Sequence, residues 1–169
     1  MGEKSKAHLK QMLESFDTAM FITRHGEQVH ARPMAVAGVE EANTLWFVTS
    51  DSSPKSNEIR RDERVSATFQ GKAEFVALSG RASLVRDRKK IEELWQTSWK
   101  AWFPNGKEDP SILLIRVTVD DAELWDMAGT KGIRYAFEMA KAVLTGDTPE
   151  VTHSQHARVN PAGPVSKPH

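Results

Sequence analysis

Hydrophobic and polar residues alternate through much of the first half of the chain with a period of two, which is typical of half-buried β-strands. The alternation and the turn residues between the runs predict strands at 19–24, 28–39, 44–49, 64–70 and 74–85. The turn His25-Gly26-Glu27 joins the first two strands as a hairpin. Gly80 in the interior of the last run predicts a bulge, a bend at a barrel corner or a close backbone approach.

Other segments have the spacing of amphipathic helices. Apolar residues at Leu9, Met12, Leu13 and Phe16 predict a short helix that packs across the sheet. Further helices are expected from about residue 54 to 62, from the cap Asp87 to about 103, and at 133–144. In the helix expected from Asp87 to about residue 103, one face carries Ile91, Leu94, Trp95, Trp99 and Trp102, so the tryptophans are interpreted mainly as core residues.

The C-terminal third predicts one more hairpin, with strands at 112–119 and 122–126 about a turn at Asp120-Asp121. Residues 148–169 contain several prolines and show no periodicity, so we expect a loosely ordered tail after a single domain at 1–147. Antiparallel strands with a few interspersed helices predict a mainly β protein, a small barrel with flanking helices, and not a doubly wound sheet.

The composition narrows the function classes. The 169 residues are 39% hydrophobic with a mean hydropathy of -0.50, and 23 Lys and Arg balance 23 Asp and Glu, so no overall field attracts nucleic acid or an anionic membrane. There is no cysteine, which excludes functions that need a thiolate as nucleophile or metal ligand. The polar first residues and the lack of a long apolar run lead us to expect a cytoplasmic protein without a membrane span.

Several familiar motifs are missing from the sequence. It contains no G-x-G-x-x-G, no P-loop and no G-x-S-x-G. His25 and His30 lie five residues apart across the expected hairpin, but no acidic cluster completes a ligand set, so we expect no metal site. A barrel that binds nucleic acid through Lys55, Arg60, Arg61 and Arg64 is a distant alternative.

The segment from Thr49 to Lys55 carries the strongest indication of a site. It joins the strand 44–49 to the start of a helix and contains Thr49, Ser50, Ser53 and Lys55. Hydroxyl groups, a lysine and the positive end of a helix dipole together can hold a phosphate. Ordinary capping of the helix by serine, with Lys55 on the surface, is the alternative interpretation.

Four motifs together resemble those of one known group of proteins. They are Arg32-Pro33-Met34, the segment Phe47 to Lys55, Ser79-Gly80-Arg81-Ala82, and Trp102-Phe103-Pro104 continuing to Asp109-Pro110. The chain resembles, over about residues 7 to 146, the general stress protein 26 group of the pyridoxamine 5′-phosphate oxidase-like, FMN-binding split barrels. The resemblance favours phosphate binding over simple capping at the segment after residue 49.

The resemblance implies a six-stranded antiparallel split β-barrel that forms a homodimer with FMN at the subunit interface. It implies that Thr49, Ser50, Ser53 and Lys55 hold the FMN phosphate and that Arg32 lies near the phosphate or the ribityl chain. The full expected cofactor set is Arg32, Pro33, Met34, Ala35, Val48, Thr49, Ser50, Ser53, Lys55, Phe75, Trp102 and Trp125. Aromatic residues such as Trp102, Phe103 and Trp125 would exclude water and stack a planar substrate or NAD(P)H.

Three departures from the true oxidases argue against pyridoxal phosphate synthesis. Pro54-Lys55 stands where the oxidases have an Arg-Lys pair, Phe75 stands where they have a glutamine, and their substrate-gripping C-terminal segment is not recognisable. We therefore expect an FMN-dependent oxidoreductase of unknown substrate. The alternatives are a flavin-storage protein of the stress response, or a deazaflavin or haem in the same groove.

Overall fold

The computed structural model describes residues 2–41, 43–127 and 156–161. The strands are β1 (Thr18–His25), β2 (Gln28–Glu40), β3 (Thr44–Ser50), β4 (Arg64–Gln70), β5 (Glu74–Val85), β6 (Ile112–Asp126) and β7 (His156–Val159). The helices are α1 (Gly2–Glu14), α2 (Pro54–Arg61) and α3 (Arg88–Leu94), with 3-10 turns η1 (Thr97–Ala101) and η2 (Gly106–Glu108).

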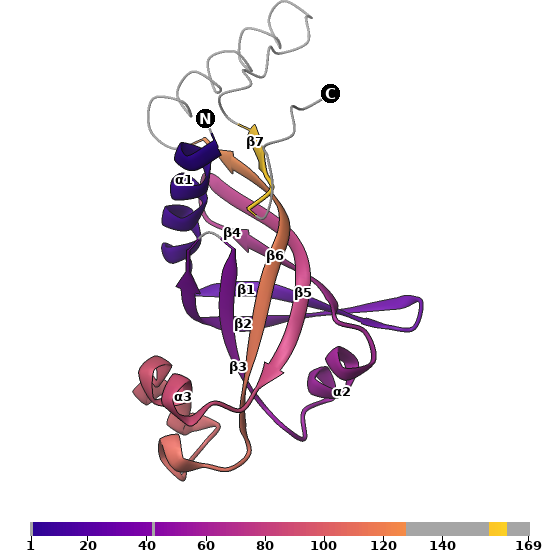
Figure 1. Cartoon of the computed structure of the whole chain (residues 1–169), viewed down its shortest axis with the longest axis vertical. Coiled ribbons are helices and arrows are strands. Elements are labelled where there is room, and N and C mark those ends of the chain that lie inside the picture. The colour runs from indigo at the N-terminus through magenta and orange to yellow at the C-terminus, as the bar shows by residue number, and fades with distance from the viewer. Residues whose placement is uncertain (1, 42, 128–155, 162–169) are drawn as a thin grey trace, which may run out of the picture.

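Six of the strands form a closed antiparallel barrel in the order β3-β2-β1-β4-β5-β6, and pairing of β3 with β6 closes it (Figure 1). This confirms the predicted fold, and the first five strands lie where the alternation placed them. The two-residue period puts Phe21, Phe47 and Phe69 inside the barrel, where all three are buried.

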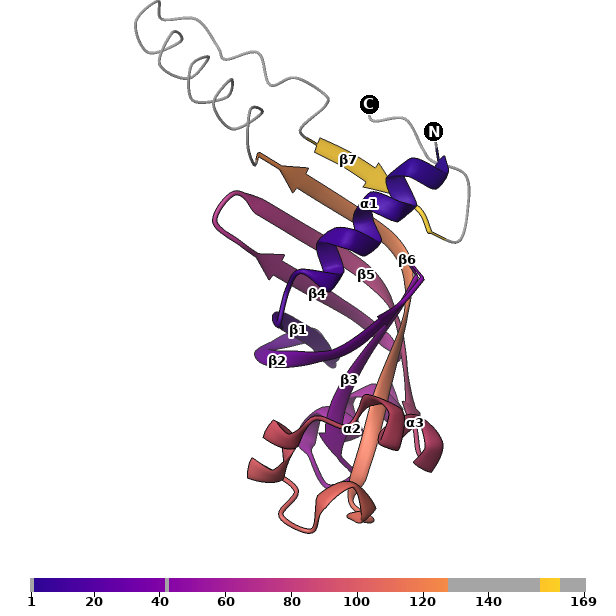
Figure 2. The same cartoon turned by 90° about the vertical axis from the view of Figure 1, so that its left-hand side faces the viewer.

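Helix α1 covers one end of the barrel, as expected from its apolar spacing (Figure 2). Leu9, Met12 and Leu13 are buried and belong to the same core as the barrel interior. The helix contacts β2, β5 and β7, so it packs across the sheet instead of extending it. The opposite end, which carries α2 and α3, is left to form the site described below (Figure 1).

The predicted hairpin about Asp120-Asp121 is wrong, because residues 112–126 form the single strand β6. Ser79 pairs with Asp121 and Gly80 pairs with Val119, which leaves Asp120 as the extra residue of a bulge. A Cβ atom on Gly80 would lie 2.2 Å from the carbonyl oxygen of Thr118. The prediction of a bulge and a close backbone approach at Gly80 is therefore confirmed, and the same bulge explains the turn-like pair of aspartates.

The long helix predicted from Asp87 to about residue 103 is also wrong. Asp87 does cap α3, but the helix ends at Leu94, and Gln96 has extended backbone angles before η1 begins. The break separates the tryptophans that a continuous helix would have aligned. Trp99 is 1% exposed in a second small core, while Trp102 is 69% exposed.

Part of the C-terminal segment differs from the expectation of a loose tail. Residues His156–Val159 form β7, which pairs antiparallel with the last half of β6. The predicted helix at 133–144 lies outside the described residues. Within the described ranges, no helix has the length and apolar character that a membrane crossing requires.

Candidate functional site

A pocket of about 350 Å³ opens at the end of the barrel that carries α2 and η1. Its volume is within the ~300–1,000 Å³ range of small-molecule sites. It is lined by Pro33, Met34, Ala35, Val48, Thr49, Ser50, Lys55, Trp99, Trp102 and Phe103. The structure thus brings together most of the residues predicted to hold a cofactor, from three segments that are far apart in the sequence.

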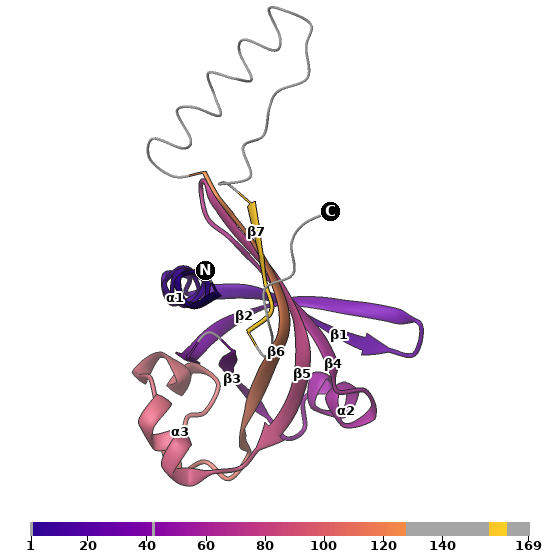
Figure 3. The same cartoon turned by 45° about the horizontal axis from the view of Figure 1, so that its top comes forward.

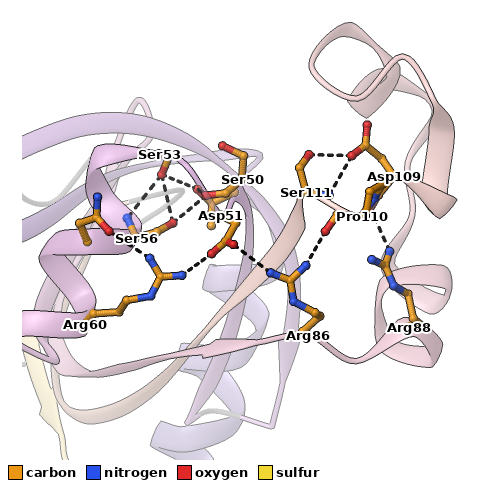
Figure 4. A network of polar contacts seen from close by, with 12 residues as sticks. Ser50, Asp51, Ser53, Ser56, Arg60, Arg86, Arg88, Asp109, Pro110 and Ser111 are labelled. Carbon is orange, nitrogen blue, oxygen red and sulfur yellow. Dashed lines mark hydrogen bonds and ion pairs between the residues drawn. The ribbon is translucent and has the colours of Figure 1, made fainter.

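The hydroxyl groups after β3 form a connected cluster. Thr49 Oγ1 and Ser53 Oγ are 2.9 Å apart, and Ser53 Oγ and Ser56 Oγ are 3.2 Å apart. The Ser56 hydroxyl donates to the carbonyl oxygen of Ser50 at 2.8 Å (Figure 4). Ser53 is the N-cap of α2 and accepts from the Ser56 N–H, so the capping role is present at the same place as the hydroxyl cluster.

A set of ion pairs fixes the turn that carries these hydroxyl groups (Figure 4). Asp51 pairs with Arg60 of α2 and with Arg86, whose Nη2 lies 3.2 Å from Asp51 Oδ2. Arg86 also donates to the carbonyl oxygen of Pro110, and the Asp51 N–H donates to that of Ser111 at 2.9 Å. The turn before α2 is therefore tied to the segment that enters β6.

Asp109 holds the loop that follows the exposed tryptophan. Its carboxylate accepts the N–H of Ser111 at 2.9 Å and the Ser111 hydroxyl at 2.6 Å, and these bonds keep the pKa of Asp109 below its usual value. Arg88 donates to the carbonyl oxygen of Asp109 at 3.0 Å (Figure 4). These contacts anchor the C-terminal end of the segment that presents Trp102 and Phe103 to the pocket.

Lys55 supplies a positive charge at the wall of the pocket. It is half-buried in the first turn of α2, which contains no acidic side chain. Burial lowers the pKa of Lys55 and the nearby Arg32 guanidinium lowers it further, while Glu58 acts in the opposite direction. Among the described residues its ammonium has no hydrogen bond or ion pair, so the local field favours an anion here.

Arg32 lies beside the pocket but is not part of its lining. Its Nη2 donates to Glu58 Oε2 at 2.9 Å and its Nη1 donates to Thr23 Oγ1 at 2.6 Å. Burial raises the pKa of Glu58, but hydrogen bonds from Thr23, His30 and Arg32 outweigh it and bring that pKa to about 2. The guanidinium is thus oriented by an ionised carboxylate whose role the sequence did not indicate.

Phe75 and Trp125 lie away from this pocket in the described chain. They are cross-strand partners, and β5 begins and β6 ends at the opposite end of the barrel from α2 and α3 (Figure 1). Conversely, Trp99 lines the pocket although its spacing suggested only a core residue. Its position depends on the break after α3, which no local pattern in the sequence indicated.

The expectation that no acidic side chain joins His25 and His30 is wrong. Glu58 joins His25 and His30, and one ligand atom from each of the three lies within 4.8 Å of the others. Glu58 follows Lys55 by three residues and so lies on a neighbouring part of the α2 surface. Only the packing of α2 on the β1–β2 hairpin brings it to the histidines.

Comparisons with known proteins agree with this architecture. The family model described as pyridoxamine 5′-phosphate oxidase like matches residues 4–150. Protein bli-3 of Neurospora crassa is 29% identical over 152 residues, which cover 82% of this chain and 72% of bli-3.

Two solved structures share the fold. A protein from Jannaschia sp. CCS1, described as a general stress protein 26, has a TM-score of 0.72 at 24% identity, covering 93% of this chain and 99% of that one. The general stress FMN/FAD binding protein of Xanthomonas citri has a TM-score of 0.63 at 29% identity, covering 74% and 89%.

Proposed function

Because this chain belongs to the pyridoxamine 5′-phosphate oxidase-like family, we propose that it binds a flavin, specifically FMN, in the pocket between β2, β3 and η1. The observation that carries the proposal is the half-buried Lys55 beside linked hydroxyl groups at the start of α2. The name of the Xanthomonas citri relative, an FMN/FAD binding protein, supports a flavin as the ligand.

The residues at the pocket fit a flavin phosphate. Lys55 would make a charge-assisted contact with it, and the hydroxyls of Thr49, Ser50 and Ser53 would donate to its oxygens. The positive end of the α2 dipole would add to this attraction. A single phosphate matches a site built at one helix start, which favours FMN over FAD.

The remaining walls suit a planar ring system. Pro33, Met34 and Ala35 come from β2 on one side, and Trp102 and Phe103 come from the η1 region on the other. An FMN ring bound there would supply the redox chemistry. The protein would place the ring, limit its contact with water and stack a planar substrate or NAD(P)H against exposed aromatic surface.

The pocket also favours a second function, flavin storage. Lys55 is the only titratable side chain among its described lining residues, so no obvious general base is provided. We propose an FMN-dependent oxidoreductase whose protein part contributes binding and orientation, with a storage protein as the alternative. We do not expect the protein to oxidise pyridoxamine 5′-phosphate. We propose that it forms a homodimer in the cytoplasm.

The test is to purify the protein without added cofactor and identify what it releases on denaturation. We expect yellow protein that releases FMN in a ratio approaching one per chain. Colourless protein that fails to take up added FMN would overturn the proposal. Release of FAD, a deazaflavin or haem would correct the ligand while keeping the pocket.

A second measurement separates the oxidoreductase from the storage protein. The FMN-loaded protein is mixed with NADH or NADPH in the absence of oxygen, and the flavin absorbance is followed. Bleaching on the time scale of turnover supports the oxidoreductase. Stable absorbance with these and other small donors supports storage.

A further inference from the structure

The β1–β2 hairpin packs against α2, and its tip extends beyond this helix (Figures 1 and 3). Thr23 pairs with His30 and Phe21 pairs with Arg32, so the side chains of Thr23, His30 and Arg32 share one face of the hairpin. His25 lies two residues beyond Thr23 and therefore points to the same face. Glu58 of α2 meets this face.

Three of these side chains can offer ligand atoms to one point. His30 Nδ1 is 2.6 Å from Glu58 Oε1, and the rings of His25 and His30 stack with centroids 5.3 Å apart. One nitrogen from each histidine and one carboxylate oxygen all lie within 4.8 Å of one another. We refer to His25, His30 and Glu58 as the histidine cluster.

We propose that the histidine cluster binds a divalent transition-metal ion of the zinc class. Two imidazoles and one carboxylate are the ligands that such an ion accepts, whereas Mg²⁺ and Ca²⁺ prefer oxygen ligands. Ligand atoms of a tetrahedral zinc site lie about 2.0–2.2 Å from the ion. The His25 and His30 side chains lie on the exposed hairpin, and small shifts of these side chains would bring all three ligand atoms to this distance from one ion.

The surroundings of Glu58 already resemble the outer shell of a metal site. Its Oε2 accepts the Thr23 hydroxyl at 2.5 Å and Arg32 Nη2 at 2.9 Å, which leaves Oε1 directed at His30. Such hydrogen bonds to the distal oxygen orient a ligating carboxylate. Because Glu58 is buried and His25 is exposed, water can complete the coordination from the solvent side.

The ordinary alternative is an ion pair between His30 and Glu58, with His25 only stacked beside it. The two interpretations differ in the part played by His25. An ion pair needs no second imidazole, whereas the metal site loses one of its three protein ligands when His25 is removed. His25 is exposed, so its substitution should not disturb the core.

The test uses the full chain without a polyhistidine tag. Zn²⁺ is titrated by calorimetry and Co²⁺ by visible absorption into the protein, His25→Ala and His8→Ala. His8 is a matched control because its Nε2 lies 3.2 Å from Asp126 Oδ2, at the other end of the barrel. We expect one ion per chain and Co²⁺ bands typical of tetrahedral coordination in the protein and in His8→Ala.

In His25→Ala we expect affinity to fall by about 100-fold or more, because loss of an outer-shell partner alone costs about 10–100-fold. Equal affinity in His25→Ala, or the absence of saturable binding to the unchanged chain, would overturn the proposal. His30→Ala gives a second test with the same expected loss. Circular dichroism without metal shows whether each variant remains folded, and the outcome does not depend on flavin binding.

Discussion

Lys55 is the residue on which the choice between a capped helix and a phosphate site turns. Ser53 caps α2 and also contacts Thr49 at the pocket, so a capping role is compatible with the proposed phosphate site. Capping alone does not account for a half-buried ammonium that makes no hydrogen bond or ion pair among the described residues. A lysine in that situation gains when an anion arrives.

Replacement of Lys55 by alanine should weaken FMN binding with little effect on stability. The lost charge-assisted contact is worth about 1.5–3 kcal/mol, which is roughly a ten- to hundredfold loss of affinity. Fluorescence titration of the flavin measures the affinity and urea unfolding measures stability. Lys72→Ala at the exposed β4–β5 turn removes the same charge and should leave the affinity unchanged.

The pH dependence of this binding offers an independent readout of Lys55. Its pKa is lowered in the free protein and should rise when a phosphate binds. The contribution of its charge is therefore complete below the pKa in the free protein and lost as pH rises through the pKa in the complex. Affinity should fall in the alkaline range, and this fall should disappear in Lys55→Ala. Unchanged affinity in the variant would mean that the phosphate lies elsewhere, and the roles of Thr49, Ser50 and Ser53 would fail with it.

Residues of the pocket were predictable where one segment carries the chemistry by itself. Thr49 to Lys55 could be interpreted because hydroxyls, a proline and a lysine follow a strand directly. The role of Glu58 could not be predicted, because a glutamate on a short polar helix has the pattern of a solvated side chain. Its burial arises only when α2 packs on the hairpin and supplies Thr23 and Arg32 as donors.

Among the elements, β5 and β6 define the shape of the barrel through the bulge opposite Gly80. The pairing shifts by one residue there, and the bulged strand β6 bends where it leaves β3 and continues toward β7. Gly80 allows this because the space for a side chain is occupied by the backbone at Thr118 and Val119.

Gly80→Ala should destabilise the protein by about 3 kcal/mol, since overpacking costs about 1–3 kcal/mol and the atom in the way is backbone. The change in the midpoint of urea unfolding, at constant slope, measures the loss. Ser79→Ala, exposed on the same strand, should stay within about 0.5 kcal/mol and serves as the control. A Gly80→Ala variant as stable as the control would show that the bulge adapts to a side chain.

The elements that the sequence predicted well are those whose pattern is local. Alternation gave β4 and β5 their correct limits, but Asp120-Asp121 has the composition of a turn and becomes a bulge only because Gly80 faces it from another strand. Likewise, the apolar spacing from Ile91 to Trp102 fits a helix, yet the chain leaves the helix at Trp95 so that Trp99 can enter a small core. Tertiary packing overrides the local pattern in both cases.

At the scale of the whole molecule, we expect a two-fold homodimer. Met20, Val29 and Trp102 are large apolar residues that remain exposed on the single chain, and a second subunit would cover apolar surface of this kind. Light scattering at micromolar concentration should give twice the chain mass of 18.9 kDa. A monomeric mass would contradict the dimer and leave the pocket to be completed by one chain alone.

The pairing of β3 with β6 has a consequence for the order in which the chain acquires its structure. The β1–β2 and β4–β5 pairs join neighbours in the sequence. In contrast, β3 pairs with β6, which follows α2, β4, β5 and the α3 region in the chain. Contacts between distant segments form slowly because a long loop must first be closed. During synthesis, β3 therefore has an unpaired edge until β6 leaves the ribosome, and this edge is where we expect nascent chains to associate wrongly.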